Sequence, residues 1–243
     1  MTLQDFSDNF TTLVNSHAYQ AETGEQLSRA DIAFDEYEKS MFLTKAQEEV
    51  ALSLYTGRNV AGTSFEETEE MRRYLAPLIE EAILSPLSAS EIEEASLKGI
   101  DSKSVFFELP NNPKLWFITY ESVNLSAGKC PSHTDMQVIP ITQDEYHRVK
   151  KNPFRGANDH RALRLDLGEG HIEVVCKYEV ESYYLRYLKK LNPIITEFLG
   201  DLEIEGKQGP MECELHESLH RRILDRAVQL ALQSRAVKSA TSD

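Results

Sequence analysis

The residues from His216 to His220 have the pattern H-E-x-x-H, which is typical of zinc peptidases. On a helix, this spacing places two imidazoles one turn apart to bind the metal, and the glutamate beside them serves as the general base. A working zinc site also needs a third protein ligand and an open position for water. The flanking residues therefore decide whether this pattern predicts catalysis.

The sequence after the pattern does not supply a third ligand. A metzincin-type extension would have glycine and histidine at the positions that Ile223 and Arg226 occupy. Only two acidic residues, Asp225 and Asp243, follow His220, so a glutamate ligand farther along the chain is missing as well. We therefore do not predict an enzyme, and a zinc hydrolase stays only as an alternative hypothesis.

The charge around the pattern and its place on a helix favour a structural role. Arg221 and Arg222 follow it directly, and their positive charge would oppose a dication. At about 100° per residue, the two histidines fall within the apolar arc of Leu219. We predict that His216 and His220 pack at the edge of a core or of a subunit interface, and that the two arginines belong to such an interface.

Two C-x-x-H pairs offer a second metal hypothesis. Cys130 with His133 and Cys213 with His216 could together supply a Cys2His2 structural zinc site. Nothing in the pattern requires the pairs to meet, and cysteine is also a common small buried residue. With Cys176, the chain has three widely separated cysteines, which favours free thiols in a reducing compartment over a disulfide scaffold. We predict no bound metal and no cofactor.

Other catalytic signatures are absent from the sequence. It has no phosphate-binding G-x-x-x-x-G-K-[ST] loop, no G-x-G-x-x-G turn and no nucleophile elbow. Paired carboxylates are frequent, but in a chain with 40 acidic residues they carry little information.

The composition is that of a globular protein with a strongly acidic surface. The 243 residues are 41% hydrophobic and 9% aromatic, enough to bury one large core or two small ones. The net charge of -14 disfavours tight, general binding to DNA and suits a channel that must not adhere to it. We read no signal peptide at the N-terminus and no apolar run long enough to span a membrane.

A cluster of basic residues runs against the overall charge. It surrounds Asn152-Pro153-Phe154, a predicted loop between strands of a sheet, and Asp159 is the only acid within it. One hypothesis is a docking patch for an acidic partner surface or for the backbone of a nucleic acid. The alternative is a basic loop that balances the acidic helices of the same protein. The cluster consists of Arg148, Lys150, Lys151, Arg155, Arg161 and Arg164.

The two ends of the chain have helical periodicity. Apolar residues recur at helical spacing around residues 6–13 and again over 216–236. Asp35 and Glu38 have the spacing of a capping box that opens another helix, and Gly57 is a typical stop for it.

The acidic stretch 64–101 is predicted to hold a helix around residues 71–79 that breaks near Pro86. We interpret its acidic residues as a solvated helix face rather than as a binding patch.

The sequence pattern in the middle of the chain is typical of short strands separated by turns. Thr142 and Glu145 form a second predicted capping box, which opens a short helix between strands. The predicted strands lie within residues 105–107, 115–120, 136–141, 163–167, 172–176 and 183–188.

These elements predict an α+β fold. Helices from both chain ends form a helical body, and the centre forms an antiparallel β-sheet or a small sandwich. The predicted parts are a helical N-terminal part over residues 1–101, a β-rich part over 102–211, and a C-terminal helix over 212–243 that packs with the N-terminal helices.

Several stretches resemble one family of tailed-phage structural proteins. Residues 34–50 resemble its EYEKS-x-FLTKAQEE helix. Residues 141–146, 152–154 and 163–165 look like its DEY…PF…RL middle. Parts of residues 184–231 are similar to its closing segment. That segment consists of a YxxRYxKKP strand, a PII segment, an IEG turn and a CEL…LH…IL..AV.LA helix. The matches occur in the family's order and cover about half of the chain.

This family is the head-to-tail ring, or adaptor, protein of crAss-like and related Bacteroidales phages. The resemblance implies a neck component of the virion that assembles in the cytoplasm of the host bacterium. Twelve copies would form a ring beneath the portal protein, with DNA passing through the middle without sequence-specific binding. In such adaptors a helical body packs side by side and a terminal segment grips the portal.

The resemblance also assigns partners to candidate residues. The C-terminal helix with Arg235 and Lys238 is the candidate for portal contact, and His216 and His220 are candidates for a subunit contact. Another neck or tail protein without portal contact is the alternative to an adaptor.

Overall fold

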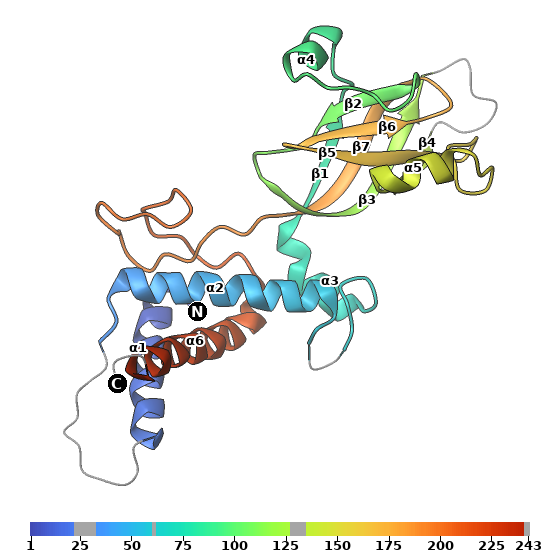
Figure 1. Cartoon of the computed structure of the whole chain (residues 1–243). Helices are drawn as coiled ribbons and strands as arrows, with labels where there is room; N and C mark the ends of the chain where they lie inside the picture. The colour runs from blue at the N-terminus through green and yellow to red at the C-terminus, as the bar shows by residue number, and fades with distance from the viewer. Residues whose placement is uncertain (22–32, 60–61, 127–134, 241–243) are drawn as a thin grey trace. The chain divides into compact units, whose positions relative to one another are not determined.

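The computed structural model describes residues 1–21, 33–59, 62–126 and 135–240, and it has the predicted α+β fold (Figure 1). The chain forms two compact units: a helical unit of Met1–Leu78 with Leu191–Asp243, and a β unit of Ile79–Lys190. The sequence placed its domain boundaries at residues 101 and 211, and that division stays a prediction beside these two units.

Three long helices form the core of the helical unit. They are α1 (Leu3–Ala21), α2 (Glu36–Thr56) and α6 (His220–Ala240), and α6 packs against both of the others. Burial of large apolar side chains from each helix supplies the main stabilising term, at roughly 25 cal/mol per Å² of apolar surface. The fully buried residues include Phe6, Phe10, Val14, Leu43, Leu54 and Ile223.

Helix α2 begins and ends where the sequence predicts. Asp35 accepts a hydrogen bond from the backbone N–H of Glu38 at 2.7 Å, and the Glu38 carboxylate accepts one from the Asp35 N–H at 3.4 Å. This confirms the capping box. Gly57 has a φ of 76°, so it ends the helix in the left-handed conformation that glycine adopts without steric cost.

The helix predicted around residues 71–79 is shorter than expected. Helix α3 (Glu69–Leu75) ends early, and a 3-10 turn, η1 (Ala76–Leu78), leads directly into strand β1 (Ile79–Leu84). β1 pairs antiparallel with β7, for example Ala82 with Leu185. The prediction failed because this pairing depends on a strand about one hundred positions away in the sequence, and local periodicity does not report it.

The described residues of the β unit form one sheet of seven strands, and none of these strands forms a second layer. Its order is β1-β7-β3-β4-β5-β6-β2, and all pairs are antiparallel except β4 with β5. The predicted strands are confirmed as β2 (Ser104–Glu108), β3 (Leu115–Leu125), β4 (Asp135–Pro140), β5 (Arg161–Gly168), β6 (His171–Val175) and β7 (Val180–Lys189).

The sheet curls around its own core. Leu87, which follows the edge strand β1, donates its backbone N–H to the carbonyl of Phe106 in the opposite edge strand β2 at 2.9 Å. The enclosed core holds buried side chains from six strands, among them Phe107, Val123 and Tyr183. A short helix, α4 (Ala89–Glu94), follows Leu87.

Helix α5 (Gln143–Lys150) covers the outer face of the sheet. Its Tyr146 and Val149 pack on Leu163 and Leu165 of β5. Thr142 is the N-cap residue, but its side chain makes no capping hydrogen bond, so the second predicted capping box is wrong. The helix is fixed by burial of its apolar face and not by its cap.

The two caps predict different losses of stability. Replacing Asp35 by alanine removes the partner of the Glu38 N–H, and we expect the free energy of unfolding to fall by about 1 kcal/mol. Urea denaturation followed by circular dichroism measures this change. Thr142→Ala is the matched control, because its side chain accepts no such bond, and it should change stability by less than about 0.5 kcal/mol. Equal losses in the two variants would contradict the assignment.

Candidate functional site

The H-E-x-x-H residues do not lie together on one helix. His216 precedes a 3-10 turn, η2 (Glu217–Leu219), and α6 begins only at His220. The exposed His216 ring accepts a hydrogen bond at Nδ1 from the Ser218 backbone N–H at 3.3 Å and lies 2.8 Å from the Ser218 hydroxyl. The one-turn geometry of a zinc peptidase is therefore not formed, and His216 acts as a cap for η2.

His220 is buried, and both of its ring nitrogens are occupied. Its Nε2 lies 3.2 Å from the Leu215 carbonyl, which can only accept, so Nε2 carries the proton. Its Nδ1 lies 3.0 Å from the Met1 amino group, and its ring packs against Phe6 at 5.4 Å between centroids. Burial lowers the pKa of His220. The side chain is thus a neutral packing element between α6 and α1. The predicted subunit contact of His220 stays a prediction.

No metal centre forms within the described residues. Among them, no three His, Cys, Asp or Glu side chains converge on one point. Cys130 and His133 lie outside the described residues. Cys213 is half-buried, and burial raises the pKa of its thiol to about 11, which disfavours the thiolate that binds zinc. Cys176 is buried in the core of the β unit, where its thiol lies 3.7 Å from the sulfur of Met136.

Arg221 and Arg222 line a groove between α2 and the start of α6, which we call the arginine groove. Arg222 donates to the Ser53 hydroxyl at 3.3 Å, and Arg221 pairs with Asp225 at 3.3 Å within its own helix. Arg226 crosses to α2 and pairs with Glu49 at 2.6 Å. The charged residues of the groove are Glu49, Arg58, Arg221, Arg222, Asp225 and Arg226.

The residues of the basic cluster, 148–164, fall into two groups in the structure: some are exposed, and others have partners within the β unit. Arg148, Lys151 and Arg155 are exposed, and they lie close to Phe154 along the chain. The side chain of Phe154 is 84% exposed. An exposed aromatic ring among cations is typical of a protein-contact surface.

The remaining residues of the cluster have partners within the β unit. Lys150 pairs with Asp101 at 2.5 Å, and Arg161 donates to the Phe154 carbonyl at 2.8 Å. Arg164 is buried in β5 and pairs with Glu121 at 3.3 Å. These three positions bond within the unit, to partners that lie outside its helices. Both hypotheses for the cluster stay predictions.

Arg235, a predicted portal-contact residue, packs on its own unit. Its guanidinium lies over the Phe34 ring at 4.7 Å and donates to the Ala33 carbonyl at 3.3 Å. The side chain of Lys238 lies outside the described part of the chain.

The most elaborate polar arrangement of the helical unit was not predicted from the sequence. An extended segment, residues 192–196, lies along α2, and three α2 side chains bind its backbone. Thr44 is central, because its hydroxyl accepts from the Ile194 N–H at 3.1 Å and donates to the Ile194 carbonyl at 3.3 Å. The Ser40 hydroxyl accepts from the Thr196 N–H at 3.1 Å, and Gln47 donates to the Asn192 carbonyl at 2.8 Å. We call this arrangement the backbone seam.

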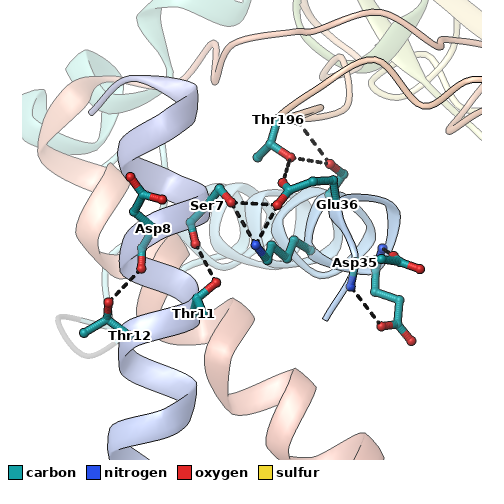
Figure 2. Close-up of polar contacts among 10 residues, drawn as sticks. Ser7, Asp8, Thr11, Thr12, Asp35, Glu36 and Thr196 are labelled. Atoms are coloured by element: carbon teal, nitrogen blue, oxygen red, sulfur yellow. Dashed lines mark hydrogen bonds and ion pairs between the residues drawn. The ribbon is translucent and has the colours of Figure 1, made fainter. Parts of the chain in front are cut away.

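Glu36 extends the seam to α1, as Figure 2 shows. One oxygen of its carboxylate accepts from the Thr196 hydroxyl at 2.6 Å. The other accepts from the Ser7 hydroxyl at 2.9 Å and from the Lys39 ammonium at 2.6 Å. Partial burial alone would raise the pKa of Glu36, but these hydrogen bonds outweigh it and the net pKa is lowered. The ionised carboxylate thus joins α1, α2 and the extended segment.

The whole chain, residues 1–243, matches the family model described as Phage tail ring protein 3/4. This chain belongs to that family. It is 43% identical over 239 residues to Ring protein 3 of Bacteroides phage crAss001, covering 97% of this chain and 96% of that protein. It is 29% identical over 243 residues to Ring protein 4/5 of the same phage, covering 95% and 92%.

The predicted resemblance is therefore confirmed, and the protein is a ring protein and a virion component of a crAss-like phage. Among the described residues, no helix combines the length and the apolar character that a membrane-spanning segment requires. The α2 residues that suggested the family now have a physical role, because Glu36, Ser40, Thr44 and Gln47 are the side chains that build the seam.

The seam of this ring protein predicts a specific loss of stability. Thr44→Val keeps the side-chain shape but leaves both backbone groups of Ile194 unpaired in a buried site, and we expect a loss of about 1–3 kcal/mol. Chemical denaturation measures it. Thr56→Val is the matched control in the same helix, because the exposed Thr56 hydroxyl donates to the Leu52 carbonyl of its own helix at 2.8 Å. If Thr44→Val cost no more than Thr56→Val, the seam would have no energetic role.

His220 predicts a pH dependence of stability. Because its pKa is lowered in the folded state, the unfolded chain takes up the proton first, near the ordinary value of 6.5. Stability is therefore highest above that pH and falls as the pH drops below it. Burial is the largest cause of the lowered pKa, and the hydrogen bond to Leu215 acts against it. The Met1 amino group and His216 also lower the pKa, while Glu217 raises it.

Thermal denaturation between about pH 8 and pH 5 tests this dependence. His220→Gln keeps a donor for Leu215 but cannot titrate, so its stability should depend less on pH than that of the wild type. His147→Gln, at an exposed position of the β unit, should retain the wild-type dependence. Identical pH profiles for the wild type and His220→Gln would refute the assignment.

Proposed function

We propose that the chain forms a closed homo-oligomeric ring at the head-to-tail junction of a crAss-like phage, where it docks beneath the portal and continues the DNA channel. The observation that carries this proposal is the match to Ring protein 3 over nearly the full length of both chains. The role is assembly rather than catalysis. Twelve copies, formed in the host cytoplasm, are the proposed number.

The charge of the protein supports a role as a channel. A net charge of -14 per copy makes a ring strongly acidic, and an acidic lumen repels the phosphate backbone of DNA. Repulsion without base contacts lets DNA pass without sequence-specific binding.

Two regions are proposed contact sites for other virion proteins. The first is the C-terminal end of α6, with Arg235 and Lys238, for the portal. The second is the exposed surface of Arg148, Lys151, Phe154 and Arg155 on the β unit, for an acidic partner surface.

A second candidate is a ring farther along the neck or tail that does not touch the portal. The family description, a tail ring protein, favours it, and so does the presence of Ring protein 3 and Ring protein 4/5 as distinct proteins in one phage. Such a ring would contact other ring proteins in place of the portal.

The two candidates differ in what the purified protein binds. Mass photometry and electron microscopy of the chain, alone and with the portal protein of the same phage, should show rings with a mass near twelve times 27.7 kDa, free or bound to portal. Rings that bind only another ring protein would favour the second candidate. A chain that remains monomeric with every virion partner would contradict both.

A further inference from the structure

The extended segment of the seam continues into a projecting loop, residues 197–210, which we call the acidic arm. Its backbone is closed by its own hydrogen bonds: Leu199 N–H to the Gln208 carbonyl at 3.0 Å, and Ile204 with Lys207 at 2.9 and 3.0 Å. Ile204 is buried within it. The arm therefore has a preformed shape and does not need to be ordered by a partner.

The surface of the arm combines exposed apolar groups with negative charge. Phe198 is 68% exposed and Leu202 is 51% exposed, which is unusual for side chains of this size. Between residues 197 and 210 the chain has four acidic residues and one lysine, and Glu197, Asp201 and Glu203 are exposed beside the apolar pair. Exposed apolar side chains with charged neighbours are typical of the anchor residues of a protein interface.

The arginine groove is the complementary surface of the same unit. It contains four arginines and two carboxylates. Arg226 and Arg221 are paired with Glu49 and Asp225. Arg222 is held by a neutral hydroxyl, so Arg58 and Arg222 supply the excess positive charge.

Helix α2 separates these two surfaces by a fixed distance. The base of the arm is bound to the first turns of α2, through Glu36 and Ser40. The groove lies at its other end, beside Glu49 and Ser53, and Figure 1 shows α6 beginning near this end. At about 1.5 Å per residue, Glu36 and Ser53 are roughly 25 Å apart along the helix. Two different surfaces at a fixed offset on one rigid body give a head-to-tail contact, which repeats from copy to copy and forms a ring where the rotation between copies closes.

We propose that the acidic arm of each copy inserts into the arginine groove of the next copy, with carboxylates of the arm against Arg58 and Arg222. The inference rests on the proposed ring function and identifies the subunit contact within it. Phe198 and Leu202 lose their exposure in this contact and supply its apolar part.

The charges favour a second copy over nucleic acid as the occupant. Tight binding to duplex DNA uses about 6–10 phosphate contacts, whereas the groove has two arginines, Arg58 and Arg222, to which the described residues offer no carboxylate partner. The arm carries a similar, opposite excess, so arm and groove nearly neutralise one another.

Charge reversal tests the contact in the full-length chain. One variant reverses the groove, Arg58→Glu with Arg222→Glu, and a second reverses the arm, Asp201→Lys with Glu203→Lys. All four side chains are exposed, so both variants should fold, which circular dichroism verifies. Self-association is measured by sedimentation velocity over the accessible concentration range. We expect each variant to associate at least about tenfold more weakly than the wild type.

Two combinations distinguish this contact from a general effect of charge. A chain with both reversals has complementary surfaces again, and an equimolar mixture of the two single-surface variants can alternate around a ring, so both should recover association. The control, Lys45→Glu with Arg72→Glu, makes the same change in net charge as the groove reversal at exposed positions of the same unit and should associate as the wild type does.

Three results would overturn the inference: reversed variants that associate as the wild type, combinations that fail to recover, or a wild type that stays monomeric throughout. The last would leave the proposed function open, because a ring can still form on the portal through other surfaces. Loss of DNA binding in the groove variant with unchanged self-association would assign the groove to nucleic acid.

Discussion

The helical unit depends on one constraint, which is that an extended backbone lying against a helix must find hydrogen-bond partners. Buried N–H and C=O groups are costly when unpaired, and a helix surface has no free backbone groups to offer. Here α2 supplies side chains instead, and a single hydroxyl, that of Thr44, pairs with both polar groups of Ile194. On its other side, Ile195 pairs with Met211. The seam therefore replaces a missing strand with a row of helix side chains.

This constraint fixes positions as well as energies. An apolar contact alone would allow the extended segment to slide along α2. The hydrogen bonds of Ser40, Thr44 and Gln47 form in only one alignment of the segment with the helix, so they fix its position. The register sets where the acidic arm leaves the unit. Farther along the chain, Glu214 holds Asn192 at 3.1 Å, so the same segment also places the residues that lead into α6. The arm and the groove thus take their spacing from one helix.

The sequence predicts those structural elements that depend on neighbouring residues. Prediction from the sequence fails for elements whose structure depends on contacts with residues far away along the chain. The Asp35 and Glu38 capping box, the α+β class and six of the seven strands follow from local patterns. Strand β1 does not, because its pairing with β7 determines it. The seam was missed for the same reason: Ser40, Thr44 and Gln47 recur at helical spacing, but a polar stripe is normally read as solvated, and only the fold shows it buried. The sequence predicted part of the groove, because the charges of Arg221 and Arg222 marked them as interface residues. Arg58 is far from them along the chain, and only the fold brings it to the same groove.

Net charge limits how copies of this chain can meet. Copies that each carry -14 repel one another at long range, and at physiological ionic strength this repulsion is screened beyond about 8 Å. A ring therefore needs attraction that acts at contact distance, where local charges outweigh the average. Exposed apolar side chains such as Phe198 and Leu202 suit this need because their burial is little affected by salt. Paired charges around them add register and exclude wrong partners more than they add affinity. Attraction at contact distance can in this way hold acidic subunits together despite their repulsion at long range.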